Sequence, residues 1–466
     1  MNTIARRLRC SIAFVALAVV AVLFSPTAAA DYAALDWVVD SALAQPHLRG
    51  AEVAIVLESL ASGEVLYERD ADRPLIPASN MKVVTGAAAL SVLGPDYRFE
   101  TTVSTDAPEL ATTLAGNLYV HGTGDPSFVS EELWKLAESI RVLGIERIAG
   151  DLVLDTSYFD SLNTTSGAVA KGDRAYHART GALSLNFNAI AVHTTPADRR
   201  GVPAVVELAP RTSFVELRGG VATGRSRSRS SLSVRRAFEH GQNVVIVSGS
   251  VPEGSDTRVH YRSLDDGPRY FGTVMREFLE SAGVKVAGDV LFAAAPDDAR
   301  TLVVHESKPL SLVVRDLNKF SNNFVAEQLV KALSAHVHGS PGTTAGGVGV
   351  LSGHLHAAGV DSASYHVEDG SGFSRQNRLT PRAIAAVIRG ALSSFGASYE
   401  FGASLSVSGT DGTLSDRMGY PELEGAVRAK TGLLDGVTAI SGVTRNASGE
   451  EVLFSIIVNG FDCEAW

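Results

Sequence analysis

The sequence predicts a mixed α/β (α+β) fold, in which an antiparallel sheet flanked by helices is split by a large β-rich insert with a nested β domain. Strand pairs typical of hairpins stand near both ends of the chain, with strong helical patterns between them. From about residue 100 to 300 short β-like runs dominate instead, and 197–262 is wholly β in character. Sheet-forming segments on both sides of such a block indicate an insertion.

The first predicted elements after residue 31 are a helix at 34–43 and a hairpin of strands at 51–57 and 64–67. A strong helical pattern then runs over 79–93 and stops at Gly94-Pro95, a pair that ends helices. This helix follows a loop interrupted by Pro74 and Pro77.

Later elements complete the predicted sheet. Helical patterns lie near 131–143, 272–282, 310–318, 323–336 and 379–393, and strands lie at 426–430, 436–443 and 452–458. We expect the first hairpin and the last strands to share one antiparallel sheet. The predicted domains are 31–98 with 300–466, an insert of 99–196 with 263–299, and the nested β domain at 197–262.

Residues 1–30 predict a secretion leader. Arg6, Arg7 and Arg9 precede an apolar run, and small residues lead to Ala30, where we expect cleavage. The apolar run is too short for a comfortable membrane span, and a retained anchor is the alternative. The expected location is extracytoplasmic, in the cell envelope or secreted, with the protein peripheral to the membrane at most.

Composition excludes several classes of protein. A chain of 466 residues with 45% hydrophobic residues can bury a large core, so it is not a disordered chain. Its net charge of −10, from 41 basic and 51 acidic residues, argues against nucleic acid binding. Cleavage would leave Cys463 as the only cysteine, so no internal disulfide is expected. The histidines show no metal-ligand spacing, and we expect neither metal nor cofactor.

Ser79-Asn80-Met81-Lys82 opens the helix predicted at 79–93. Residues three apart lie on one helix face, so Lys82 can sit beside the Ser79 hydroxyl. Serine needs a neighbour to take its proton, and a lysine, with a pKa of about 10.4, can do so only where burial or nearby positive charge lowers that pKa. Taken alone, this motif favours the other interpretation, in which Ser79 is a helix cap and Lys82 a solvated side chain.

Two further motifs favour a catalytic role for Ser79 and Lys82. Ser321-Asn322-Asn323 stands between two helical runs, and Lys430-Thr431-Gly432 ends a predicted strand. Each alone could be a helix cap or a turn. Together, in the order SxxK, SxN and KTG, they match the motif set of the penicillin-recognising serine acyl-transferases.

The long stretch between the first two motifs excludes a small β-lactamase, because such an enzyme has no room for so large a segment between them. The chain resembles the D-alanyl-D-alanine carboxypeptidase/endopeptidase family that carries a large insert there, the class C low-molecular-mass penicillin-binding proteins (peptidase family S13). The resemblance covers nearly the whole mature chain. It also rests on the segments at 77–82, 124–127, 182–188, 369–375 and 409–414.

This resemblance implies a serine β-lactamase/transpeptidase-like fold and a serine DD-peptidase. Such an enzyme cleaves D-Ala-D-Ala in peptidoglycan stem peptides through an acyl-enzyme, with D-alanyl cross-links as a further possible substrate. β-Lactam antibiotics, which mimic the acyl donor, would bind covalently as inhibitors.

The resemblance also implies roles for single residues. Ser79 is similar to the nucleophile, Lys82 to its general base, and Ser321 to the proton relay toward the departing D-alanine. The substrate-binding positions it implies are Asn323 for the substrate amide, Lys430 and Thr431 for the terminal carboxylate, and the backbone N–H groups of Ser79 and Leu433 for the oxyanion.

Three positions depart from the family or match it less specifically. The family commonly has Thr or Ser where this chain has Leu433, so a hydroxyl contact to the carboxylate is missing. Asp155 resembles an insert aspartate beside the pocket for the stem-peptide side chain, where it could pair with an amino group; an Asx-turn is the alternative. Arg375, in a Gly/Ser loop, resembles a substrate-contacting arginine.

The family's fold usually closes with a C-terminal helix, and we expect that helix to be lost here or the sequence to be truncated. Two other functions stay open. A β-lactamase or esterase on the same scaffold would hydrolyse the penicilloyl ester quickly. A non-catalytic wall-binding module would not react with a fluorescent penicillin at all.

Overall fold

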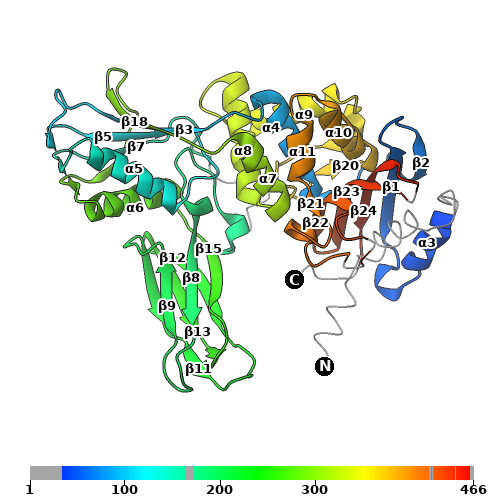
Figure 1. Cartoon of the computed structure of the whole chain (residues 1–466), viewed down its shortest axis with the longest axis horizontal. Helices are drawn as coiled ribbons and strands as arrows, with labels where there is room; N and C mark the ends of the chain where they lie inside the picture. The colour runs from blue at the N-terminus through cyan, green and yellow to red at the C-terminus, as the bar shows by residue number, and fades with distance from the viewer. Residues whose placement is uncertain (1–33, 163–171, 419–420, 422, 447, 462–466) are drawn as a thin grey trace. The chain divides into compact units, whose positions relative to one another are not determined.

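The computed structural model describes residues 34–162, 172–418, 421, 423–446 and 448–461, which form two compact units (Figure 1). The first unit comprises the described residues up to Tyr97, Pro309–His338 and those from Thr344 onward. The second unit comprises Arg98–Lys308 and Gly339–Thr343. The predicted leader with its cleavage point, the expected C-terminal helix and Cys463 lie outside the described residues.

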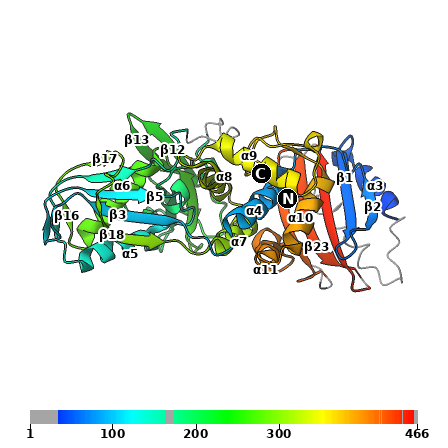
Figure 2. The same cartoon turned by 90° about the horizontal axis from the view of Figure 1, so that it is seen from above.

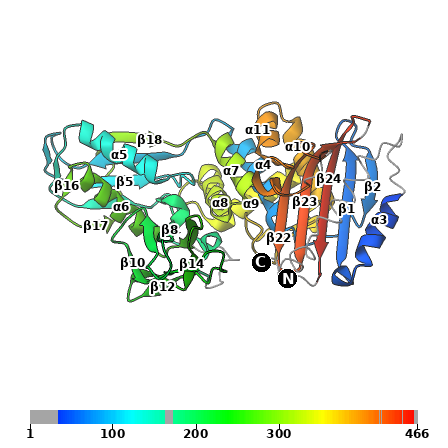
Figure 3. The ribbon, with the colours of Figure 1, turned by 60° about the horizontal axis from the view of Figure 1, so that its bottom comes forward.

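A six-stranded sheet organises the first unit (Figure 3). Its order is β2 (Val65–Arg69), β1 (Glu52–Ser59), β24 (Glu451–Asn459), β23 (Val437–Arg445), β22 (Val427–Leu434) and β21 (Ser406–Val407), and every pair is antiparallel. Strand β1 runs against β24 along its whole length, from Glu52↔Asn459 to Ser59↔Val452. The prediction that the two ends of the chain share one antiparallel sheet is therefore confirmed.

The central strands β1 and β24 are buried on both faces, because helices pack against each face of the sheet. The helix α3 (Ala34–Leu43) places Leu35 and Val39 against side chains of β1 and β24 such as Ile55 and Phe454. At the edge of the sheet Tyr67 Oη donates to Asp36 Oδ1 over 2.7 Å, which ties α3 to β2. The helix predicted at 34–43 thus forms as expected.

The other face carries the remaining helices of the unit (Figure 2). The predicted helices appear as α4 (Met81–Leu93), α7 (Leu310–Phe320), α8 (Asn323–His338) and α10 (Pro381–Ser393). The sequence missed α9 (Thr344–Ala357) and α11 (Ser398–Ser404). Four glycines in α9 disfavour a helix locally, yet a Cβ on Gly347 would lie 2.0 Å from the Val330 carbonyl oxygen. Close packing against α8 therefore explains the glycine at position 347.

The second unit is built on a five-stranded mixed sheet of order β17-β7-β5-β3-β18. Its strands are β17 (Val290–Phe292), β7 (Leu152–Asp155), β5 (Leu118–Gly122), β3 (Glu100–Thr105) and β18 (Arg300–Glu306), with helices α5 (Ser130–Val142) and α6 (Gly267–Ser281). Because β18 pairs with β3, residues 300–308 belong to this unit. The predicted boundary at 299/300 lies nine residues too early, since the unit ends at Lys308.

The segment 197–262 contains strands and no helix in the structure, as its composition predicted. One small sheet has the order β15 (Arg258–Ser263), β8 (Ala189–Thr195) and β9 (Val205–Ala209); another is β10 (Val215–Gly219), β13 (Gln242–Ser248) and β12 (Ser233–Glu239). The strand β8 pairs with both β9 and β15, so the β-rich part begins before the predicted boundary at 197. That this part is a separate domain stays a prediction.

Candidate active site

Ser79 lies in a tight 3-10 turn, Ala78–Asn80, that leads directly into α4. The helix proper begins at Met81, two residues later than the predicted start. Ser79 is half-buried, whereas Lys82, in the first turn of α4, is fully buried. Gly372 packs against this turn. Its φ is +77°, and a Cβ added to it would lie 1.8 Å from the Ala78 carbonyl oxygen. No side chain can therefore replace this glycine without moving the turn.

The Lys82 amine lies among three oxygen atoms. Its Nζ is 3.0 Å from Ser79 Oγ, 2.7 Å from Asn323 Oδ1 and 2.7 Å from the carbonyl oxygen of Ser371. A neutral amine has two hydrogens and one lone pair. If the hydrogens are donated to Asn323 and Ser371, the lone pair faces the Ser79 hydroxyl, which is the arrangement that a general base needs.

Burial makes the neutral form of this amine accessible. It lowers the pKa of Lys82 from 10.5 to about 7, while the charges of Asp369 and Glu327 act in the opposite direction. Desolvation penalises a charged ammonium more than a neutral amine, which is the physical cause. Near neutral pH a large fraction of Lys82 is therefore able to accept a proton.

The second and third motifs also meet. Ser321 lies between α7 and α8 in the left-handed conformation, with φ +55°, and Lys430 Nζ donates to its hydroxyl oxygen over 2.8 Å. Lys430 also donates to the carbonyl oxygen of Thr431 over 2.7 Å. Burial, followed by the charge of Lys82, holds the pKa of Lys430 well below its usual value. Strand β22 continues to Leu434, so this motif lies within the strand and not at its end as predicted.

Gly432 explains how β22 approaches the Ser79 turn. A Cβ at this position would lie 2.9 Å from the Pro77 carbonyl oxygen, 3.0 Å from Asn80 Nδ2 and 3.1 Å from Ala78 Cβ. Only a residue without a side chain lets the strand and the turn come this close. The glycine of the third motif therefore brings Lys430 and Thr431 beside Ser79.

Gly432→Ala is expected to push the Ser79 turn away from β22, and to lower both the melting temperature and the rate of covalent labelling by a fluorescent penicillin. Gly349→Ala is the matched control, because a Cβ at Gly349 in α9 meets nothing within 4 Å. The control should label at the wild-type rate with equal or higher stability. Labelling of Gly432→Ala at the control's rate would contradict this account of the close approach.

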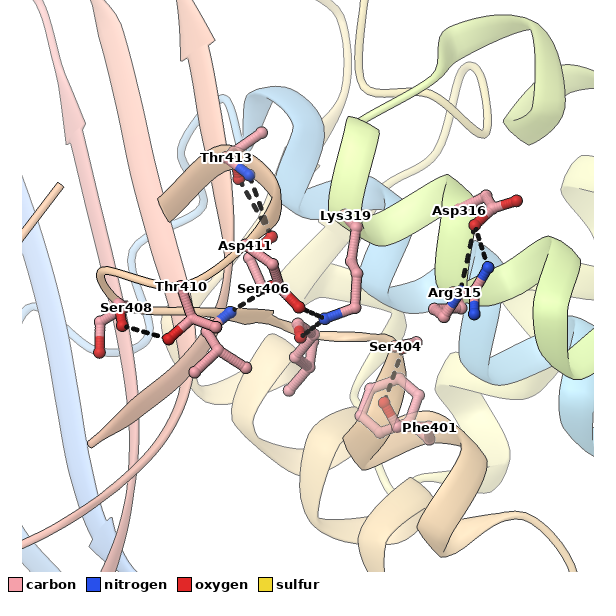
Figure 4. A network of polar contacts seen from close by, with 12 residues as sticks. Arg315, Asp316, Lys319, Phe401, Ser404, Ser406, Ser408, Thr410, Asp411 and Thr413 are labelled. Carbon is pink, nitrogen blue, oxygen red and sulfur yellow. Dashed lines mark hydrogen bonds and ion pairs between the residues drawn. The ribbon is translucent and has the colours of Figure 1, made fainter. Parts of the chain in front are cut away.

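A polar network holds the loop that carries Asp411 and Thr413 (Figure 4). Thr431 Oγ1 donates to Thr413 Oγ1 over 2.8 Å. The loop that carries Thr413 is anchored by Asp411, which accepts from Lys319 Nζ at 2.5 Å and from the backbone N–H of Val407 at 2.9 Å. Since Lys319 is two residues before Ser321, the network joins the end of α7 to β22.

Asp155 ends β7 in the second unit and is 5% exposed. Its carboxylate accepts from His121 Nδ1 at 3.1 Å, Ser157 N–H at 3.0 Å, Ser157 Oγ at 2.6 Å and Ala295 N–H at 3.0 Å. Burial alone would raise the pKa of Asp155, but these hydrogen bonds outweigh it and hold the pKa well below the usual range. The contacts with Ser157 form the Asx-turn considered as the alternative.

Arg375 is exposed, and its Nη2 donates to the carbonyl oxygen of Asp435 over 2.5 Å. Both residues line a cavity of about 430 Å³ at the end of β22 and β23. Leu433 is half-buried within β22. The structure thus shows two sets of direct contacts among the predicted residues. Lys82 contacts both Ser79 and Asn323, and Lys430 contacts Ser321.

Sequence reasoning missed three groups at this site: the Ser371 carbonyl that accepts from Lys82, and the buried acids Glu327 and Asp369. One signal was available, because Glu327 interrupts an apolar helical run at 323–336.

Within the part of the chain that the structure describes, no group of three His, Cys, Asp or Glu could hold a metal ion. No helix of that part is both long and apolar enough to cross a membrane.

A model of the D-Ala-D-Ala carboxypeptidase 3 (S13) family matches residues 35–465. The chain belongs to the S13 peptidase family. It is 36% identical over 437 residues to the D-alanyl-D-alanine carboxypeptidase of Actinomadura sp. (strain R39), covering 91% of this chain and 80% of the relative. The family predicted from the motifs is confirmed, and with it a serine-type D-Ala-D-Ala peptidase.

Solved structures agree with the S13 assignment. Penicillin binding protein 4 (dacB) from Haemophilus influenzae matches with a TM-score of 0.78 and 25% identity, over 91% of this chain and 93% of that one. The same protein complexed with a β-lactam matches with a TM-score of 0.73 and 25% identity, over 90% and 93%. The predicted transpeptidase-like fold with a β-rich insert is therefore confirmed.

Proposed function

We propose that this S13 peptidase cleaves the terminal D-Ala-D-Ala bond of peptidoglycan stem peptides through an acyl-enzyme on Ser79. The observation that carries the proposal is the contact of the fully buried Lys82 amine with Ser79 Oγ at 3.0 Å. A nucleophile within hydrogen-bond reach of a base with a lowered pKa is the arrangement that acyl transfer requires.

In the first step Lys82 Nζ takes the hydroxyl proton while Ser79 Oγ attacks the carbonyl carbon of the penultimate D-alanine. The oxyanion is held by the backbone N–H groups of Ser79 and Leu433. The C–N bond then breaks, and Ser321, which accepts a hydrogen bond from Lys430, relays to the departing amine of D-alanine the proton that Lys82 has taken from Ser79. Water hydrolyses the resulting ester of Ser79 and restores the hydroxyl.

Substrate binding follows from the same contacts. Asn323 uses Oδ1 for Lys82, so its amide N–H₂ is the group offered to a substrate carbonyl. Lys430 and Thr431 bind the terminal carboxylate through a cation and a hydroxyl. Thr413, whose hydroxyl lies 2.8 Å from that of Thr431, stands where a second hydroxyl is useful, since Leu433 supplies none.

Release of D-alanine tests the proposal. The purified chain should liberate D-alanine from a peptide ending in D-Ala-D-Ala, and a fluorescent penicillin should remain bound through SDS denaturation. Rapid loss of that label by hydrolysis would favour the β-lactamase alternative. Absence of both labelling and D-alanine release from a folded chain would favour a wall-binding module.

Thr431→Val is expected to weaken turnover of substrates with a terminal carboxylate more than turnover of esters that lack one. Loss of one hydrogen bond to a charged group costs about 1.5–3 kcal/mol, or roughly 10- to 100-fold in kcat/KM. The two substrate types are compared on the same preparation. Equal losses for both would contradict the carboxylate role.

Asp155 and Arg375 stay predictions as substrate contacts. Because the Asp155 carboxylate already accepts four hydrogen bonds, an amino group of the stem peptide would have to replace a donor such as His121. The substrate class supports an extracytoplasmic site of action, since peptidoglycan lies outside the cytoplasm. The cleaved leader remains a prediction from the sequence.

A further inference from the structure

The backbone of Gly370 and Ser371 lies between a buried carboxylate and the Lys82 amine. The N–H of Ser371 donates to Glu327 Oε1 over 2.9 Å, and the N–H of Gly370 donates to Oε2 over 3.4 Å. On the other side, the Ser371 carbonyl accepts from Lys82 Nζ over 2.7 Å, and the Gly370 carbonyl accepts from Thr85 Oγ1 over 2.7 Å. The backbone of these two residues is therefore held from both sides, by α8 and by α4.

We propose that Glu327 is a positioning residue for acyl transfer: it fixes the carbonyl oxygen that holds the Lys82 amine against Ser79. Glu327 contacts no reacting atom, and it acts through the Ser371 backbone. This inference rests on the proposed acylation of Ser79.

The burial of the acid supports a role beyond packing. Glu327, in α8, is 4% exposed, and Asp369, in the loop that carries Gly370 and Ser371, is fully buried. Burying a carboxylate costs free energy unless hydrogen bonds compensate, and an apolar side chain at such a position would stabilise the core more simply. Burial, followed by the charge of Asp369, raises the pKa of Glu327, and the hydrogen bonds from the backbone N–H groups of Gly370 and Ser371 act in the opposite direction. The acid is therefore matched to the loop that it holds.

The same loop also supports the nucleophile. Asp369 accepts from the N–H groups of Gly372 at 2.7 Å and Ser374 at 2.6 Å, and from Asn377 Nδ2 at 2.9 Å, which closes the loop on itself. Gly372 packs against the carbonyl of Ala78, directly before Ser79. A shift of the loop would thus move both the base and the turn that carries the nucleophile. A displacement of about 1 Å in such an arrangement can cost about 10²-fold in rate.

Glu327→Gln tests the proposal in the full chain, by stopped-flow acylation with a fluorescent penicillin. The amide keeps an oxygen for one N–H but turns its N–H₂ toward the other, so the loop loses an anchor without losing volume. We expect acylation to slow about 10- to 100-fold, while the dissociation constant of the initial non-covalent penicillin complex stays unchanged.

Glu58→Gln is the matched control. Glu58, in β1 of the same unit, is 3% exposed, and its carboxylate pairs with Arg389 and not with the backbone of Gly370 and Ser371. Its substitution makes the same chemical change in an equally buried acid. We expect a loss of thermal stability with the acylation rate of the folded protein unchanged.

Thr85→Val provides a second variant, since it removes the hydroxyl that holds the Gly370 carbonyl from the opposite side. Both groups hold the same backbone, so the double variant with Glu327→Gln should lose less than the product of the single losses. If Glu327→Gln does not fold, slowed acylation in Thr85→Val supports the anchored loop and a wild-type rate overturns it.

The outcomes separate the two proposals. A wild-type chain that penicillin does not label would overturn the acyl-enzyme itself. A labelled wild type with Glu327→Gln acylating at the wild-type rate would overturn only the positioning role. Equal slowing in Glu327→Gln and Glu58→Gln would do the same, because it would show a general effect of lost stability.

Discussion

Replacement of Ser79 by alanine is expected to abolish covalent labelling by penicillin while the chain stays folded. The Ser79 hydroxyl lies 3.0 Å from Lys82 Nζ, whereas the Ser321 hydroxyl is held by Lys430. Without Oγ there is no atom to form the ester. The structural cost should be small, about 1 kcal/mol, as for loss of a hydroxyl at a helix start.

The measurement is a gel assay with a fluorescent penicillin, paired with thermal unfolding of the same preparation. Ser62→Ala is the control, because Ser62 lies in the same unit and its hydroxyl only accepts from the N–H of Glu64 in a turn. That variant should label fully. Retained labelling of Ser79→Ala would assign the nucleophile to another serine.

The local part of the site was predictable from the sequence. Three-residue spacing at a helix start brings Lys82 to Ser79 by helix geometry alone, and the structure has them in contact. The meeting of Ser321 with Lys430 could be expected only through the resemblance, because no local rule links residues so far apart. Their contact depends on where α7 ends and on the register of β22.

The supporting groups could not be predicted in the same way. A carbonyl oxygen such as that of Ser371 carries no signal in the sequence, since every residue has one. Glu327 was not singled out, although it is an acid in an apolar helical run, because its partners are backbone N–H groups of a loop that only the tertiary fold brings near. Hydrophobic periodicity reports which face is buried, and it does not report what a buried polar group meets.

The fold, like the site, was predictable where local patterns decide it and not where tertiary packing does. Strands β1 and β24 were recognised because their apolar runs are continuous, as expected for strands covered on both faces. The helix α9 was missed because its glycines lower the local helix propensity, and close packing on α8 requires the one at position 347. The end of the insert was misplaced because β18, at 300–306, pairs with a strand that precedes it by about two hundred residues.

Lys82→Ala is expected to slow acylation of Ser79 by about 10²–10⁴-fold, which is the contribution of general-base catalysis. The amine accepts a proton only when it is neutral, and burial lowers its pKa to about 7. Wild-type acylation should therefore rise with pH through about 7 and level off above it. Near pH 5 only about 1% of Lys82 would be neutral.

This dependence on pH separates the base from a residue that only fills space. In Lys82→Ala the residual acylation should lose the rise centred near the Lys82 pKa of about 7, because the group that titrates there is gone. The measurement is the acylation rate constant for penicillin between pH 5 and pH 9, with thermal unfolding recorded at each pH to confirm that both proteins are folded. A variant that keeps the wild-type pH profile at a lower rate would show that another group takes the Ser79 proton. In that case the contact between Lys82 Nζ and Ser79 Oγ would orient the nucleophile without activating it.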